Sequence, residues 1–221
     1  MSASTVRWET RLRTAAEGVH YLVARNEEIL ETLPVAAMDQ AAASDLPPWR
    51  AVEHAASRTL LRALLREIGE DIRAGPVAAR RSGRPYLPDR PGLGVSLSHS
   101  SGWAAAAVGR DRDVGIDVQI PSRVSDRMLR FCCSPEDAET LALLPEDRRR
   151  REFAWIFTAK EACVKAVGTG LSGRPWIVPV TLGQRTGHWE HVHWSAPRHR
   201  RPVPLSCAWT ERPARDGESE A

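Results

Sequence analysis

The sequence predicts an α+β fold with two similar pseudo-repeat halves, each a helix packed on a small antiparallel sheet. Apolar residues recur at helical spacing in two long segments, short strand patterns follow each segment, and this order occurs twice. A chain of 221 residues is long enough for one large domain or two small ones. We expect an N-terminal half over 1–120, a C-terminal half over 121–210 and a disordered polar tail over 211–221.

The first half should begin with a strand over 17–24 and continue with a helix from Trp49 to Ile68. The next segment, 74–94, is rich in glycine and proline, which is typical of loops and turns. Three strands should follow, the last two joined as a hairpin across 109–113: 95–98, 103–108 and 114–118.

The second half shows the same order of elements. Ser134 and Pro135 form a favourable helix start, and a longer helix is expected from about Arg149 to Val167, stopped by Gly168. Three strands should then close the chain, over 176–182, 188–194 and 203–210.

Composition and charge exclude several classes of protein. Hydrophobic residues make up 42% and charged residues 27%, and no apolar run reaches the ~18 residues that a membrane span needs. The four cysteines show no CxxC spacing and the N-terminus has no apolar signal core, so we expect a reduced, cytoplasmic protein. A net charge of +3 is too small to indicate a nucleic-acid-binding protein, but it suits an acidic partner.

Lysine is almost absent from this chain. Of 31 basic residues only Lys160 and Lys165 are lysines, and they lie five residues apart. We interpret this as a local need for a compact ammonium group, where the planar guanidinium of arginine would not fit.

Three other patterns are better explained without a special function. Gly94–Ser98 resembles the nucleophile elbow of a serine hydrolase but lacks its last glycine and its following helix. Gly168–Gly170 resembles a phosphate loop but follows a helix instead of preceding one. His191 and His193 would share one face of a strand, yet no third metal ligand is evident.

Three segments combine groups that suit a metal ion and a phosphate. Asp117 and Gln119 should face the same side of an apolar strand, where an aspartate is costly unless paired or metal-bound. Glu161 and Lys165 should share a helix face, as an ordinary ion pair or as a site for a hard cation and a phosphate. The third segment, Ser98–Ser100, follows the glycine- and proline-rich loop and offers hydrogen-bond donors to a phosphate.

Four motifs occur in an order and spacing that resemble those of the phosphopantetheinyl transferases, specifically the long, two-half Sfp type. They are GRPYL at 83–87, VSLSHS at 95–100, GIDV at 115–118 and FTAKEACVK at 157–165. Each motif alone is weak, whereas the ordered set is specific, and the resemblance covers nearly the whole chain.

The resemblance implies a holo-[acyl-carrier-protein] synthase, which transfers 4′-phosphopantetheine from coenzyme A to a serine hydroxyl of an acyl- or peptidyl-carrier protein. The by-product would be adenosine 3′,5′-bisphosphate and the cofactor Mg²⁺. The partner would be an acidic carrier-protein domain of polyketide, nonribosomal peptide or fatty acid synthesis. We expect a monomer that binds neither nucleic acid nor a membrane.

By position, the resemblance implies that Asp117 and Glu161 bind Mg²⁺ and that Lys165 contacts the α-phosphate and supports the leaving group. Glu161, directly or through a water, would be the general base. The family commonly has a second acidic ligand where this chain has Gln119, whose carboxamide oxygen can still bind Mg²⁺. Lys160 neighbours this site, and the resemblance gives it no clear role.

The resemblance also implies further contacts with coenzyme A: Ser98 and His99 with the phosphates, Gly83, Arg84 and Pro85 with the adenine, and Arg50, Arg58 and Thr59 with the 3′-phosphate. The last set would give a binding role to a basic helix face that is otherwise only solvated. The alternative is a non-catalytic coenzyme A-binding module on the same fold, and only Gln119 favours it.

Overall fold

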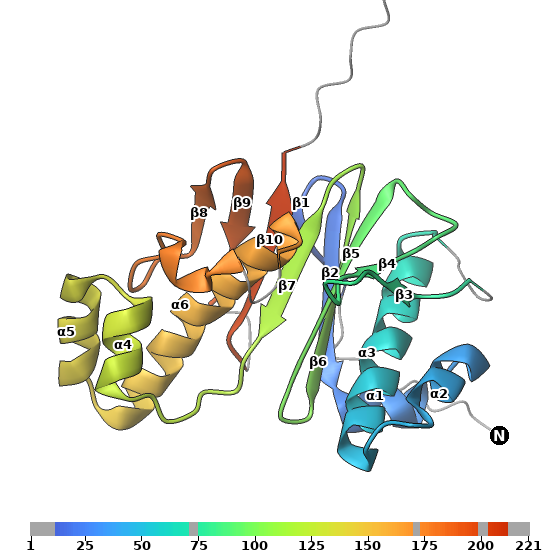
Figure 1. Cartoon of the computed structure of the whole chain (residues 1–221), viewed down its shortest axis with the longest axis horizontal. Helices are drawn as coiled ribbons and strands as arrows, with labels where there is room; N and C mark the ends of the chain where they lie inside the picture. The colour runs from blue at the N-terminus through green and yellow to red at the C-terminus, as the bar shows by residue number, and fades with distance from the viewer. Residues whose placement is uncertain (1–11, 71–74, 170–172, 199–202, 212–221) are drawn as a thin grey trace, which may run out of the picture.

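The computed structural model describes residues 12–70, 75–169, 173–198 and 203–211. These residues form helices and two four-stranded antiparallel sheets that lie side by side (Figure 1). The predicted α+β class is therefore confirmed. Within the described residues, none of the helices combines the length and the apolar character that a membrane crossing requires.

The elements follow one another along the chain in both halves. The helices are α1 (Asn26–Thr32), α2 (Ala37–Ala43), α3 (Pro48–Glu67), α4 (Asp126–Cys132), α5 (Pro135–Leu143), α6 (Glu146–Val167) and the 3₁₀-helix η2 (Pro175–Ile177). The strands are β1 (Arg13–Ala16), β2 (Val19–Arg25), β3 (Ala78–Ala79), β4 (Pro85–Tyr86), β5 (Leu93–Ser100), β6 (Trp103–Arg110), β7 (Val114–Val118), β8 (Thr186–Trp189), β9 (Val192–Ser195) and β10 (Leu205–Thr210).

The first sheet has the strand order β1-β2-β6-β5, and the long helix α3 packs against it. Helix α3 begins at Pro48, a favourable first position, and ends before Gly69, whose φ of +80° suits glycine. The four leucines of 60–65 are fully buried between the helix and the sheet. The predicted strand over 17–24 and the predicted helix to Ile68 are thus confirmed.

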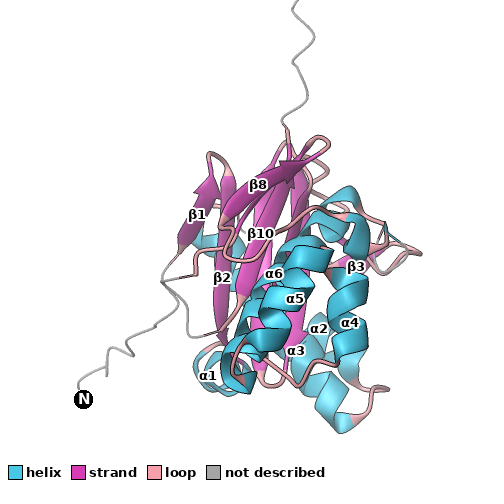
Figure 2. Cartoon of the chain, turned by 90° about the vertical axis from the view of Figure 1, so that its left-hand side faces the viewer, coloured by secondary structure: helices cyan, strands magenta, loops and turns pink. Residues whose placement is uncertain are grey.

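The second sheet has the strand order β7-β10-β9-β8 and packs against the other long helix, α6. Helix α6 begins at Glu146, directly after Pro145, and ends at Gly168, whose φ is +81°. Both long helices lie on the same side of the strands (Figure 2). At Gly115 of β7, an added Cβ would lie 1.9 Å from the carbonyl oxygen of Ala162, so strand and helix meet backbone to backbone.

The predicted hairpin across 109–113 is wrong. Strand β6 is already paired on both sides, with β2 and with β5, so it has no free edge for β7. The chain instead changes sheets between Arg110 and Val114, and β7 pairs with β10. This change of sheet precedes the boundary predicted at residue 121.

Two of the three closing strands differ from the prediction, whereas the strand predicted over 203–210 is confirmed as β10. The segment 176–182 holds part of η2 and a loop, because Pro175 and Pro179 lack the backbone donors that a ladder needs. The segment 188–194 is not one strand: β8 and β9 form a hairpin that turns at Glu190, with a φ of +53°. Of the predicted tail, all but Glu211 lies outside the described residues.

The two sheets also share a buried core. Side chains from β2 and β6, including Tyr21 and Ala105, pack against Ile116 of β7 and against Leu205 and Cys207 of β10. Burial of this apolar surface stabilises the contact between the halves and fixes β5 and β7 as neighbours.

The backbone contact at Gly115 generates the first prediction. Gly115→Ala places a Cβ against the α6 backbone, and overpacking of this kind costs about 1–3 kcal/mol. We expect a melting temperature lower by several degrees in differential scanning calorimetry. Gly92→Ala is the matched control, because its Cβ would lie 3.2 Å from a movable side chain, that of Asp111. Equal melting temperatures for both variants would contradict the close contact of α6 with β7.

Candidate active site

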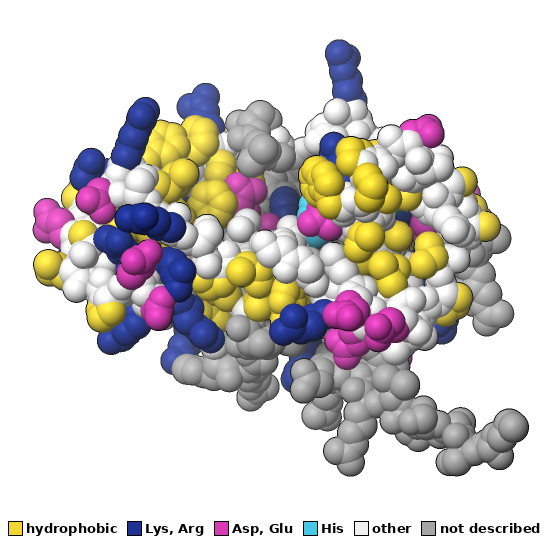
Figure 3. Space-filling model, turned by 90° about the horizontal axis from the view of Figure 1, so that it is seen from below, with side chains coloured by type: hydrophobic (Ala, Val, Ile, Leu, Met, Phe, Trp, Pro, Cys, Tyr) yellow, Lys and Arg dark blue, Asp and Glu magenta, His cyan; other side chains and the backbone are white. Residues whose placement is uncertain are grey.

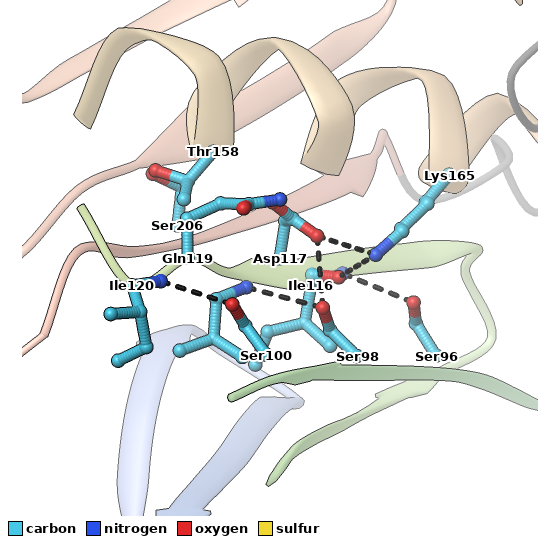
Figure 4. Close-up of polar contacts among 11 residues, drawn as sticks. Ser96, Ser98, Ser100, Ile116, Asp117, Gln119, Ile120, Thr158, Lys165 and Ser206 are labelled. Atoms are coloured by element: carbon cyan, nitrogen blue, oxygen red, sulfur yellow. Dashed lines mark hydrogen bonds and ion pairs between the residues drawn. The ribbon is translucent and has the colours of Figure 1, made fainter. Parts of the chain in front are cut away.

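Strands β5 and β7 run parallel along the seam between the two sheets, and serine side chains of β5 bridge them (Figure 4). Each hydroxyl accepts a hydrogen bond from a backbone N–H twenty residues further along the chain: Ser96 from Ile116 at 3.1 Å, Ser98 from Val118 at 3.2 Å and Ser100 from Ile120 at 3.0 Å. These hydroxyls satisfy buried backbone donors, as a strand ladder would otherwise do.

Asp117 lies at the centre of this seam, and its carboxylate is fixed from three directions. Its Oδ1 accepts from Ser98 Oγ at 2.8 Å and from Lys165 Nζ at 2.6 Å, and its Oδ2 accepts from Gln119 Nε2 at 3.2 Å (Figure 4). Asp117 and Gln119 therefore face the same side of the strand, as predicted. With only 3% of its surface exposed, Asp117 needs these partners to remain buried.

Lys165 reaches the seam from helix α6. Its Nζ donates to the carbonyl oxygen of Ile116 at 3.0 Å and to Asp117 Oδ1 (Figure 4). An ammonium group has three hydrogens, so two are engaged by these acceptors and the third can serve a ligand.

Glu161 lies one helical turn before Lys165 and is 6% exposed. Its Oε1 is buried and has no hydrogen-bond partner among the described residues. Burial raises the pKa of Glu161, the negative charge of Asp117 raises it further, and the positive charge of Lys165 lowers it in part. The two carboxylates and the ammonium therefore share one electrostatic environment, and Glu161 has an acceptor oxygen to spare.

A cavity of about 420 Å³ lies next to these groups. Glu161 and Lys165 line it together with Gly83, Arg84 and Pro85. The structure thus brings together five predicted site residues from two motifs about 80 positions apart in the sequence. Three residues that the motif analysis did not assign to the site also line the cavity: Ser96, Leu97 and Gly168.

Arg84 is held at the wall of this cavity. Its guanidinium pairs with Asp113 at 2.5 Å, and it packs so closely on Gly168 that an added Cβ there would lie 2.6 Å from Arg84 Nη1. The loop of 82–85 is therefore anchored both to the end of α6 and to the segment where the chain changes sheets.

The remaining predicted residues lie away from this cavity. On α3, Arg50 is exposed, Thr59 is buried, and Arg58 lies 3.7 Å from Asp39 and donates to the carbonyl oxygen of Val77. His99 follows Ser98 but points to the other face of β5, where its Nδ1 lies 3.2 Å from Glu53 Oε2. Of the pair Ser98 and His99, only Ser98 contacts Asp117.

Lys160 points away from Lys165 into the protein. It is buried, and its Nζ donates to the carbonyl oxygen of Val178, next to η2. Burial lowers the pKa of Lys160, and the neighbouring thiols Cys133, Cys132 and Cys163 oppose this shift. Both lysines thus donate to a backbone carbonyl, one in the candidate site and one in the core.

The donor set for a metal consists of few groups. No cluster of three or more histidine, cysteine, aspartate or glutamate side chains that could hold a metal is found in the described ranges. This includes His191 and His193, since His191 lies in the turn before β9 and the expected shared strand face does not exist. The candidate ligands at the seam are the carboxylates of Asp117 and Glu161 and the carboxamide of Gln119.

Comparison with known proteins gives one consistent result. Residues 113–203 match the 4′-phosphopantetheinyl transferase superfamily, and residues 38–109 match the N-terminal domain of 4′-phosphopantetheinyl transferases. A 4′-phosphopantetheinyl transferase of Nostoc sp. is 36% identical over 95 residues, which are 41% of this chain and 40% of that protein.

Two further relatives are similar over longer segments. A 4′-phosphopantetheinyl transferase of Bacillus pumilus is 30% identical over 123 residues, covering 53% of this chain and 52% of the relative. An L-aminoadipate-semialdehyde dehydrogenase-phosphopantetheinyl transferase of Eremothecium gossypii is 32% identical over 173 residues, covering 72% and 60%. The chain therefore spans about half the length of the curated relatives that it matches.

The buried carboxylate of Glu161 generates the second prediction. Because its pKa is raised on folding, the folded state binds this proton more tightly than the unfolded chain. The stabilisation is complete below the unfolded pKa and is lost as the pH rises through the folded pKa. In metal-free buffer at pH 7, Glu161→Gln should therefore raise the melting temperature, by roughly 2–4 °C for each kcal/mol gained.

The difference between the wild type and Glu161→Gln should shrink as the pH falls towards the ordinary pKa of a glutamate. Glu139→Gln, on the exposed surface of α5, is the control and should change nothing. A Glu161→Gln difference that is the same at pH 5 and pH 8 would show that this carboxylate is not strained by burial.

Proposed function

Since this chain belongs to the 4′-phosphopantetheinyl transferase superfamily, we propose that it transfers 4′-phosphopantetheine from coenzyme A to a serine hydroxyl of an acyl- or peptidyl-carrier protein. The product besides the modified carrier is adenosine 3′,5′-bisphosphate. One observation carries the proposal: the unpartnered carboxylate oxygen of Glu161 lies buried beside the Asp117–Lys165 pair, at a cavity lined by the 83–85 loop. This arrangement suits a substrate with a charged pyrophosphate.

Mg²⁺ fits this set of donors. The ion prefers oxygen ligands, few of them from protein, and Glu161 offers a buried oxygen that no hydrogen bond satisfies among the described residues. Asp117, Glu161 and Gln119 would hold it. When bound, Mg²⁺ would neutralise charge on the pyrophosphate.

The protein side chains account for the remaining chemistry. The carrier serine oxygen forms a bond to the β-phosphorus of the pyrophosphate, and the bond from this phosphorus to the bridging oxygen breaks. Glu161 takes the serine proton, a role for which a raised pKa is suitable. Lys165 donates its third hydrogen to the leaving α-phosphate, and Ser98 keeps Asp117 oriented.

The adenosine part of coenzyme A would extend along the first half. Gly83, Arg84 and Pro85 line the cavity and would contact the adenine. Arg50, Arg58 and Thr59 of α3 would receive the 3′-phosphate, with Arg58 exchanging part of its interaction with Asp39 for the ligand. His99, whose side chain is 49% exposed, would also reach a phosphate.

The strand orders support the proposal that the halves are pseudo-repeats. In the first sheet, the strand before the long helix is followed in space by β6 and then β5. In the second, the strand before the long helix is followed by β10 and then β9. In each half, the last strand in sequence therefore lies between the strand before the helix and the penultimate one.

We also propose a monomeric, cytoplasmic protein with an acidic carrier-protein domain as its partner. The test of function incubates the chain with an apo-carrier protein, coenzyme A and Mg²⁺, followed by mass spectrometry of the carrier. A gain of one phosphopantetheine group is the expected result. Binding of coenzyme A without any gain in carrier mass would instead favour the non-catalytic module.

The shape of the ammonium group generates the third prediction. Lys165 Nζ fits between the Ile116 carbonyl oxygen and Asp117, and a planar guanidinium cannot keep both contacts and also reach a phosphate. Lys165→Arg should lower kcat by roughly 10²-fold, the effect of losing one preorganised donor. Arg151→Lys, on the exposed side of α6, is the control. Retention of kcat within a factor of two would remove Lys165 from the mechanism.

The fourth prediction concerns Gln119. A glutamate at this position adds a negative charge beside Asp117, so Gln119→Glu should raise the Mg²⁺ affinity of the free protein and lower the Mg²⁺ concentration for half-maximal rate. Calorimetric titration and initial rates measure the two quantities. Gln40→Glu, exposed on α2, adds the same charge elsewhere and should change neither. If both variants behave like the wild type, Gln119 lies outside the metal's coordination shell.

A further inference from the structure

Large hydrophobic side chains gather on the surface of the second half, over α4 and η2. Met128 and Phe131 of α4 are 44% and 54% exposed, and Trp176 and Ile177 of η2 are 37% and 54% exposed. The rings of Phe131 and Trp176 lie 4.7 Å apart, at an angle of 42°, so the two elements form one surface, the α4–η2 cluster. Seen from below, the molecule shows hydrophobic side chains on either side of a hollow (Figure 3).

The core beneath this cluster holds it in place. Leu129 and Cys132 anchor the inner face of α4, while Pro175 anchors η2. The buried ammonium of Lys160 donates to the carbonyl oxygen of Val178, which directly follows η2. An exposed aromatic pair on such a fixed support is already ordered, and binding to it therefore costs little conformational entropy.

The charge around the α4–η2 cluster is positive. Arg127 precedes Met128 and lies one turn before Phe131, and Arg174 directly precedes η2; both are exposed. None of the ion pairs found within the described part of the chain involves either arginine, whereas the nearby acid Asp126 lies 3.6 Å from Arg149. Aromatic residues, methionine and arginine are the residue types enriched at protein interfaces.

The cluster lies close to the reaction centre. Lys160 and Glu161 are adjacent on α6, so one points into the support of the cluster and the other into the seam. The two surfaces are thus separated by about one helix diameter, roughly 10 Å. A protein bound to the cluster would hold a neighbouring serine near the cavity.

We propose that the α4–η2 cluster is the docking surface for the carrier protein, and that it receives an acidic amphipathic helix whose apolar face packs on Phe131 and Trp176. This inference rests on the proposed function. Arg127 and Arg174 attract the acidic residues of that helix, and Lys160 is the positioning residue that holds η2 beneath it. Four side chains are too few for a stable dimer of this chain, whereas they suit a transient complex with a substrate that must leave.

The test measures binding of an apo-carrier protein by calorimetry without coenzyme A, so that no turnover occurs. Loss of two central aromatic contacts should weaken binding by at least about tenfold in the double variant Phe131→Ala, Trp176→Ala. Its affinity for coenzyme A should be unchanged. Leu143→Ala is the control, because Leu143 is 87% exposed on α5 and outside the cluster.

Two further variants separate the parts of the proposal. Arg127→Glu with Arg174→Glu should weaken carrier binding and flatten its dependence on salt. Lys160→Met should raise the KM for the carrier but not the KM for coenzyme A, with its fold checked by circular dichroism. Wild-type affinity for the carrier in the double aromatic variant would overturn the docking surface.

The outcomes also distinguish this inference from the proposed function. If the wild type binds the carrier through the cluster but transfers no phosphopantetheine, the docking surface stands and the transferase function is wrong. If the wild type transfers the group and the double aromatic variant does so with the same KM for the carrier, the function stands and the docking surface is wrong.

Discussion

The row of serine hydroxyls between β5 and β7 is the constraint on which the rest of the site depends. Ser96, Ser98 and Ser100 satisfy the backbone donors of a strand that has β10 on one side and no ladder partner on the other. Because side chains bridge the seam, it is wider than a paired sheet, and α6 can place Glu161 and Lys165 against it. The junction between the halves is therefore also the place where a ligand can bind.

The charges at this junction are balanced for a substrate that brings its own. Asp117 is neutralised by Lys165 and by two neutral donors, whereas Glu161 has an oxygen without a partner in the described structure. Burial of an unsatisfied carboxylate opposes folding, as the raised pKa of Glu161 shows. Such local strain is typical of sites that are completed by a ligand, here a metal ion with a pyrophosphate.

Much of this site could be predicted from the sequence, since i, i+2 spacing places Gln119 beside Asp117 and the ordered motifs point to Glu161 and Lys165. The bridging role of Ser96 and Ser100 was visible only as alternation in VSLSHS, because nothing local shows that β7 leaves the first sheet. Helix α4 has seven residues, too few for a clear periodicity, and the segment of η2 has strand-like residues between two prolines. Contacts across the halves, such as Lys160 with Val178, depend on tertiary packing.

The central claim is that the seam joins a metal ion and the coenzyme A pyrophosphate at Asp117 and Glu161. It is tested most directly by calorimetric titration of coenzyme A with and without Mg²⁺, in the wild type and in Asp117→Asn. Mg²⁺ should strengthen binding of coenzyme A to the wild type by more than tenfold and should have little effect on the variant. Equal affinity of the wild type for coenzyme A with and without Mg²⁺ would contradict the claim.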